Sequence, residues 1–291
     1  MNIESISPEY YTLKEFKFNN GKVLENQTVE YMTMGTPQYD DEGHITNAII
    51  YFHGTSGNYG SIKRIGVALG ENLPFDTNKF FFVSLSTLGT PGSSSPSTSK
   101  LNSDYPEYTI LDMVNFNKKF LDECLNIVSP LGLIGNSMGG FEAVTWAAVY
   151  PDDISFLISL VSSYKVGGQN YVLSKVMNDI ITSDKDFNNK KVTGDLKRAL
   201  ELSSKAMYSF GLSRQFYMDQ STSDIDKYMD EFAMEDSQED VLDAYYRNNA
   251  SMNYDLTDII SNITAKTLII GIYEDQYFPP ELDAIPMHTL I

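Results

Sequence analysis

The sequence predicts an α/β fold, a mostly parallel sheet with helices on both faces, and three observations support this prediction. Short apolar segments that end at Gly, Pro or Ser alternate with amphipathic segments of helical length along most of the chain. Residues 164–262 interrupt this alternation with a helix-rich pattern that contains no proline. One junction between a strand and a helix carries a serine flanked by glycines. We therefore predict a core, residues 1–163 and 263–291, with a helical cap inserted at residues 164–262.

The strands of the predicted sheet are nearly continuous apolar runs, which suits burial on both faces. Residues 109–127 carry apolar side chains at three- and four-residue steps and predict a helix. A second helix is predicted over residues 138–150, where Pro151 ends it. The single cysteine, Cys124, falls on the apolar stripe of the first helix and is interpreted as a buried structural thiol. The predicted strands cover residues 27–34, 47–53, 79–85, 131–136, 154–162 and 266–272.

Composition excludes several classes of function. The net charge of −18 argues against nucleic acid and against an anionic membrane surface, since both need an excess of Lys and Arg. A single cysteine excludes an intramolecular disulfide and a cysteine-built metal site, and no metal site is predicted. The N-terminus lacks the pattern of a targeting peptide and no apolar run reaches the ~18 residues of a membrane span, so a cytoplasmic location is expected. Residues 219–243 hold ten acidic side chains against one lysine, which predicts a solvated helical face.

The motif with the clearest chemistry is Gly135-Asn136-Ser137-Met138-Gly139, between an apolar strand and a predicted helix. This context is what a nucleophile elbow requires. A serine on so tight a turn adopts strained backbone angles, and glycines on either side avoid collisions with neighbouring backbone. Ser137 is therefore the predicted nucleophile, with a purely structural turn as the alternative.

A serine hydroxyl needs a base, and the base needs an orienting acid. In proteins with this elbow the chain order is serine, then an acid after a late strand, then histidine. Glu274 and Asp275 follow the predicted strand 266–272 and are the candidate acids; the alternative is a pair of solvated loop carboxylates.

An oxyanion formed at the serine needs two backbone N–H donors. One is the N–H of Met138, directly after the nucleophile. The other belongs to the loop that follows the strand 47–53, where Thr55 is the predicted donor. His53, at the end of that strand, is interpreted as a structural residue that shapes the loop rather than as the base.

The sequence does not identify the catalytic base. The chain has three histidines, and none of them lies at the position expected for the base. His44 lies in a polar turn, His53 is assigned to the oxyanion loop, and His288 lies in a helix-like tail. A further strand and a histidine-bearing loop are expected after that tail, but the sequence ends first. Three interpretations stay open: the chain is truncated, His288 is recruited, or the protein is a pseudoenzyme or uses another base.

From about Gln27 to its end, the chain resembles the homoserine O-acetyltransferases and their relatives of the α/β-hydrolase superfamily. The resemblance rests on the segments FDTNKFFFVSLSTLGTPGSSSPST, YTILDMVNFNKKFLDECLNI, GLIGNSMGGFEAVTWAAVYPDDI and LIIGIYEDQYFPP. It implies Ser137 as nucleophile and Asp275, ahead of Glu274, as the acid. It also implies that Arg214, in a Gly-Leu-Ser-Arg segment, holds a substrate carboxylate. Where that family has a substrate-contacting tyrosine, this chain has Ser221, which puts homoserine in doubt but not acyl transfer.

The expected function is an acyl-enzyme acyltransferase that moves an acyl group from a small-molecule donor to a small hydroxyl acceptor. No bound cofactor is expected, and acetyl-CoA is a candidate co-substrate. Lys63 and Arg64 are candidate contacts to its phosphates, or simply a solvated basic pair. A carboxylic ester or thioester hydrolase and a non-catalytic binding protein are the alternatives. The resemblance alone suggests a homodimer built through the cap.

Overall fold

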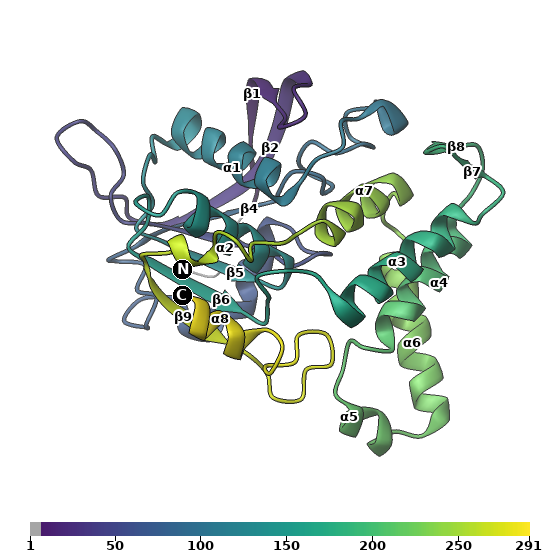
Figure 1. The fold of residues 1–291 in the computed structure, drawn as a ribbon. Helices are drawn as coiled ribbons and strands as arrows, with labels where there is room; N and C mark the ends of the chain where they lie inside the picture. The colour runs from purple at the N-terminus through teal and green to yellow at the C-terminus, as the bar shows by residue number, and fades with distance from the viewer. Residues whose placement is uncertain (1–6) are drawn as a thin grey trace.

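The computed structural model describes residues 7–291 and confirms the predicted α/β fold, with helices packed on a twisted, mostly parallel sheet (Figure 1). The sheet has seven strands in the order β1-β2-β4-β3-β5-β6-β9. β1 and β2 pair antiparallel, as do β2 and β4, and all later pairs are parallel. The strands are β1 Glu9–Lys17, β2 Val23–Gly35, β3 Ala48–Phe52, β4 Phe81–Leu85, β5 Gly132–Asn136, β6 Phe156–Leu160 and β9 Lys266–Ile270.

Apolar side chains cover both faces of the sheet. On one face, α1 Ile110–Leu125 and α2 Met138–Val149 pack over a large core that includes Phe52, Leu133 and Trp146. On the other face, the 3-10 helix η2 Tyr59–Ala68 covers a smaller cluster. The short helix α8 Ala284–Leu290 lies beside β9, as the sequence predicted for the tail.

Cys124 is less buried than predicted. It is half-buried on α1, and its Sγ lies 3.6 Å from the hydroxyl of Tyr31 on β2. The apolar stripe of α1 meets the sheet there near its edge, so solvent still reaches part of the thiol. Burial raises the pKa of Cys124, which keeps it in the unreactive thiol form at neutral pH.

The segment between β6 and β9 is mainly helical and extends to one side of the sheet (Figure 1). Two-residue strands β7 Phe187–Asn188 and β8 Lys191–Val192, not predicted from the sequence, form a small hairpin within it. Its helices are α3 Gly168–Thr182, α4 Lys197–Tyr208, α5 Arg214–Asp219, α6 Thr222–Asp236 and α7 Val241–Met252.

The sequence suggested that the acidic stretch 219–243 is a solvated helical face, but the structure shows that part of it is buried. Its last carboxylate, Asp243 on α7, is fully buried. Asp243 accepts hydrogen bonds from the Ser95 hydroxyl and the Ser97 N–H, both at 2.9 Å. These bonds offset part of the cost of burying the carboxylate and fix α7 to the loop that follows β4. No helix within residues 7–291 has the length and apolar character needed to cross a membrane.

Candidate active site

The carboxyl ends of the parallel strands bring three sequence-predicted segments to one edge of the sheet. Phe52 at the end of β3 pairs with Gly135 on β5, which places the loop after β3 beside the elbow. The registers β5–β6 and β6–β9 set Asn136 and Ile270 at the same level through Leu160. The loop that carries Asp275 therefore starts at the same edge, two strands from Ser137. Ligands of open parallel sheets bind at this edge.

Ser137 has the backbone geometry of a nucleophile elbow. Its φ of 54° and ψ of −120° lie outside the regions that a residue with a side chain prefers. A Cβ on Gly135 would lie 2.2 Å from the Gly139 carbonyl oxygen, and one on Gly139 would lie 2.2 Å from that of Phe52. Both glycines are therefore required sterically, as the motif predicts.

The two predicted oxyanion donors lie beside this serine. Gly54 approaches the elbow so closely that a Cβ on it would lie 3.4 Å from Ser137 Cβ. Thr55 follows Gly54, and Met138 is the first residue of α2. Within residues 7–291, the hydrogen bonds leave the N–H groups of Thr55 and Met138 without a protein acceptor. Ser162 donates to the Ser137 carbonyl oxygen at 2.8 Å and holds the turn from the far side.

His53 is a structural residue of the oxyanion loop, as its sequence position suggested. Its Nε2 accepts a hydrogen bond from the Thr87 N–H at 3.1 Å, so the ring proton is on Nδ1, which donates to the Gly54 carbonyl oxygen at 2.6 Å. Burial lowers the pKa of His53 to about 4, so the ring is neutral at ordinary pH. In a trans peptide the C=O and N–H point in opposite directions. The Gly57 N–H donates to the same carbonyl oxygen at 2.9 Å, so His53 and Gly57 together aim the Thr55 N–H away from the core.

Replacing His53 with alanine is expected to lower kcat for an activated ester by about 10²-fold while changing KM little, because one oxyanion donor loses its orientation. Steady-state kinetics on p-nitrophenyl acetate measure both constants. His44→Ala, at a half-exposed histidine in a surface turn, is the control and should leave them unchanged. A His53→Ala loss confined to KM would contradict this role.

Sequence reasoning missed a buried carboxyl behind the elbow. Glu142 on α2 is completely buried, and its Oε2 accepts hydrogen bonds from the Thr87 hydroxyl and the Asn117 side-chain amide, both at 2.7 Å. Burial raises the pKa of Glu142 to about 8 against these two bonds. Since Thr87 also donates to His53, this network ties α2 to the oxyanion loop. The sequence feature that could have revealed this carboxyl is that Glu142 is the single charged residue in the apolar helix segment FEAVTWAAV.

Glu142→Gln is expected to raise stability at pH 8 and to leave it nearly unchanged at pH 5. The native carboxyl keeps its proton up to about pH 8, whereas the unfolded one loses it near pH 4.5. Between these values the native state binds more protons, so the wild type loses stability as pH rises. Glutamine needs no proton to stay neutral. Urea midpoints at both pH values test this, with exposed Glu71→Gln as control; equal midpoint changes at pH 5 and 8 would refute it.

Of the two candidate acids, the structure fixes Asp275 and leaves Glu274 in solvent. Asp275 Oδ1 accepts hydrogen bonds from the Tyr277 and Phe278 N–H groups at 2.7 and 2.9 Å. This turn holds the carboxylate partly buried, and among residues 7–291 both side-chain hydrogen bonds of Asp275 use Oδ1, which leaves Oδ2 without a partner. Such a carboxylate can orient a base.

The described residues do not bring a histidine to Ser137 by any hydrogen bond. His288 is exposed on α8, and His44 is half-exposed beside Asp40. Two further candidate residues also lie in solvent: Arg214 at the start of α5 and Arg64 on η2. The position of a base and the role of Arg214 stay predictions.

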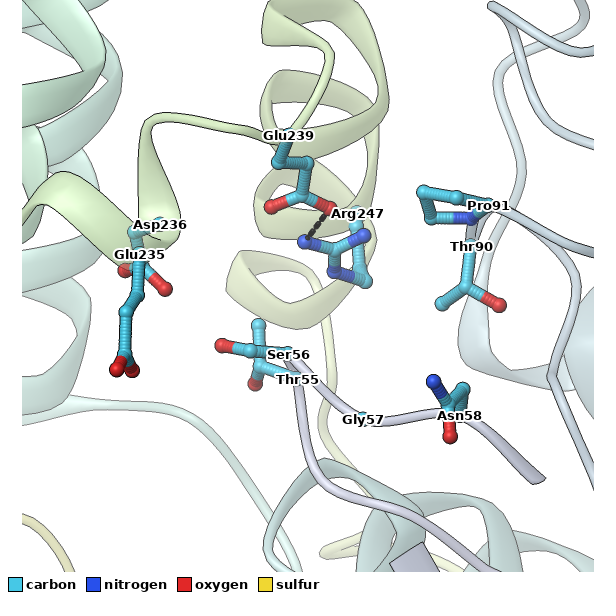
Figure 2. A pocket seen from close by; sticks show the side chains of 10 residues that line it. All are labelled: Thr55, Ser56, Gly57, Asn58, Thr90, Pro91, Glu235, Asp236, Glu239 and Arg247. Carbon is cyan, nitrogen blue, oxygen red and sulfur yellow. Dashed lines mark ion pairs between the residues drawn. The ribbon is translucent and has the colours of Figure 1, made fainter. Parts of the chain in front are cut away.

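A cavity of about 270 Å³ opens beside the oxyanion loop (Figure 2). The loop residues 55–58 and Thr90–Pro91 form one side, and the α6–α7 junction forms the other. Arg247 on α7 lines it, 2% exposed and ion-paired with Glu239. No local sequence pattern indicated Arg247, because it is the docking of α7 that brings this residue to the loop.

A strained serine between a parallel strand and a helix, with two free N–H groups beside it, defines the class of α/β-hydrolase-fold proteins. A family model described as alpha/beta hydrolase fold matches residues 47–286. The chain belongs to this family.

The chain is also similar to two curated relatives and to one solved structure. A probable acyltransferase of Methanothermobacter thermautotrophicus is 45% identical over 99% of this chain and 89% of its own. A homoserine O-acetyltransferase of Methanohalobium evestigatum is 26% identical over 96% of this chain, which spans 65% of that protein's length. An acetylester hydrolase of Corynebacterium glutamicum is 21% identical, with a TM-score of 0.84 over 98% of this chain and 85% of that one. This last likeness shows the fold.

Proposed function

We propose that this protein is a serine acyltransferase that forms an acyl-enzyme at Ser137 and passes the acyl group to a small hydroxyl acceptor. The observation that carries the proposal is the strained Ser137 beside two unpaired N–H groups at the carboxyl edge of the sheet. The relative that is 45% identical is named a probable acyltransferase, which supports acyl transfer as the reaction class.

In the proposed mechanism, Ser137 Oγ attacks an acyl carbonyl, and the serine proton goes to a base that Asp275 orients. The N–H groups of Met138 and Thr55 stabilise the oxyanion of the tetrahedral intermediate. His53 and Gly54 keep the Thr55 donor in place. Departure of the donor's leaving group gives the acyl-enzyme, and a hydroxyl acceptor then attacks the same carbonyl.

Hydrolysis of carboxylic esters or thioesters is the second candidate, and one observation favours it over transfer from acetyl-CoA. The cavity beside the oxyanion loop is lined by Glu235, Asp236 and Glu239 and by one cation, Arg247, which is already paired. Such a surface repels a phosphate-rich donor. Comparing acetyl-CoA with p-nitrophenyl acetate, with water as the only acceptor and then with added hydroxyl compounds, separates the two reactions.

The decisive experiment is intact-mass analysis of the purified natural protein before and after a fluorophosphonate probe, with Ser137→Ala as control. One adduct that the alanine variant loses would support the acyl-enzyme. Absence of an adduct on folded protein would favour a non-catalytic binding protein instead. The same spectrum tests truncation, because a natural chain longer than this sequence has a mass above 32.7 kDa.

A further inference from the structure

Glu142 lies between the two elements that supply the oxyanion donors, and no step of the proposed mechanism uses it. It is on α2, one turn after Met138, whose N–H is one of the donors. Thr87 connects it to the other donor, because the Thr87 hydroxyl donates to Glu142 Oε2 at 2.7 Å and the Thr87 N–H donates to His53 Nε2 at 3.1 Å. His53 in turn holds the loop that presents the Thr55 N–H. A change at Glu142 can therefore alter the spacing of the two donors.

The hydrogen bonds around Glu142 lack a donor, and a proton on its carboxyl supplies one. Glu142 Oε2 accepts from the Asn117 side-chain amide as well as from the Thr87 hydroxyl, each at 2.7 Å. Glu142 Oε1 and Asn117 Oδ1 are both buried acceptors without a partner among residues 7–291. A carboxylate only accepts hydrogen bonds and would leave both oxygens unsatisfied, whereas a protonated carboxyl has an O–H to donate. The geometry by itself therefore favours the neutral form.

An ionised Glu142 would have no countercharge within the described part of the chain. Besides α1, the elements that pack closely against α2 are β3, β5, β6 and the 3-10 helix η4 Ile260–Asn262, and these contain no charged residue. His53, the other titratable group of the network, is neutral at ordinary pH. Burial therefore dominates and raises the pKa of Glu142 to about 8. The charged residues of α1 are hydrogen-bonded, ion-paired or exposed: Asp112, Lys118, Lys119, Asp122 and Glu123.

We propose that Glu142 is a positioning residue, whose protonated carboxyl holds α2 and the oxyanion loop in register and whose ionisation lets the two oxyanion donors separate. This inference rests on the proposed acyl-enzyme mechanism. The carboxyl proton passes to solvent water, no other bond changes, and the carboxylate left behind needs hydrogen bonds that the buried site does not provide. Movement of Thr87 or α2 toward such bonds displaces a donor, which then stabilises the tetrahedral oxyanion less. Turnover therefore falls as pH rises through the ionisation of Glu142.

The pH dependence of p-nitrophenyl acetate turnover tests this role, with the spontaneous rate subtracted. At a pKa of about 8, the protonated fraction falls about 10-fold between pH 7 and pH 9, so wild-type kcat should fall about 10-fold with KM little changed. Glu142→Leu lacks both hydrogen bonds and should lower kcat at both pH values. Glu142→Gln, neutral and of the same size, should rescue most of that loss and should show no alkaline decline. Exposed Glu71→Gln is the control and should keep the wild-type profile.

Thr87→Val shows whether the alkaline decline belongs to Glu142. The valine keeps the N–H that donates to His53 and loses the hydroxyl that stabilises the ionised carboxylate, so the pKa of Glu142 should rise further. The decline of kcat should then begin at a higher pH than in the wild type. A residue that only packs the core would lower kcat or stability without moving the pH profile.

The fluorescence of Trp146 follows the same ionisation without any catalysis. Trp146 is the single tryptophan of the sequence, is fully buried and lies on α2 one turn after Glu142. Movement of α2 should therefore change its emission, with a midpoint near pH 8 in the wild type. The midpoint should lie at a higher pH in Thr87→Val, and Glu142→Gln should show no such step.

An alkaline decline of kcat that is equal in the wild type and in Glu142→Gln would overturn the positioning role. So would a decline whose midpoint does not follow that of Trp146 in Thr87→Val. These two variants keep the test valid even where Glu142→Leu fails to fold. A wild type with neither turnover nor a fluorophosphonate adduct would contradict the proposed function; a Trp146 step near pH 8 in that protein would still support the coupling of Glu142 to α2, and its absence would exclude it.

Discussion

Replacing Ser137 with glycine should lower ester hydrolysis by about 10⁴-fold or more, because the nucleophile is removed, and should also stabilise the protein relative to Ser137→Ala. At φ 54° and ψ −120°, any side chain on residue 137 strains the backbone, and glycine releases this strain. Strain of this kind is worth about 1–3 kcal/mol, and the greater freedom of glycine in the unfolded chain cancels part of the gain. We expect a net difference of about 1 kcal/mol between the two variants.

Comparing the glycine and alanine variants isolates the strain, because both lack the hydroxyl. Urea unfolding gives the difference in stability, and hydrolysis of p-nitrophenyl acetate gives the activity of each variant. If Ser137→Gly unfolds at the same or a lower urea concentration than Ser137→Ala, the serine is not a strained nucleophile held in place by its surroundings. In either case, Ser137→Gly and Ser137→Ala must lose ester hydrolysis to the same extent, because both lack the hydroxyl.

The elbow could be predicted from sequence because all its requirements lie within five consecutive residues. Gly135 and Gly139 are needed by contacts that any tight strand-to-helix turn makes, so the pattern carries the geometry. The parallel strands were equally readable, since each is a short and nearly continuous apolar run. Asp275 could not be identified from a local pattern alone. Glu274 and Asp275 both follow a late strand, and only the resemblance favoured Asp275. The structure then shows a turn that fixes Asp275 alone.

What could not be predicted depends on contacts distant in sequence. β1 was missed because Leu13 and Phe16 are the buried side chains in a strand otherwise rich in polar residues. Arg247 reaches the oxyanion loop because the neighbouring Asp243 anchors α7 to Ser97, far away in the chain. The acidic run concealed this anchor, since a buried aspartate and a solvated one look alike in sequence. Local patterns therefore predicted the elbow and its candidate nucleophile, and tertiary contacts determine what surrounds them.

The tight approach of α2 to β3 predicts a large loss of stability from a single added methyl group. A Cβ on Gly139 would lie 2.2 Å from the Phe52 carbonyl oxygen and 2.6 Å from that of His53. Both are backbone atoms at the end of a central strand that pairs on either side, so they cannot move away. Gly139→Ala must therefore push α2 off the sheet. Overpacking typically costs about 1–3 kcal/mol, and a clash with fixed backbone atoms belongs at the upper end of that range.

The same displacement should remove activity, because Met138 and the oxyanion loop lie on the two surfaces that separate. Gly66→Ala is the matched control, since an added Cβ there meets nothing within 4 Å. Urea midpoints of both variants, with circular dichroism to verify the fold, measure the cost. A Gly139→Ala midpoint close to that of Gly66→Ala would mean that the contact between α2 and β3 can relax. In that case the glycine would serve the turn at Ser137 and not the packing of the helix on the strand.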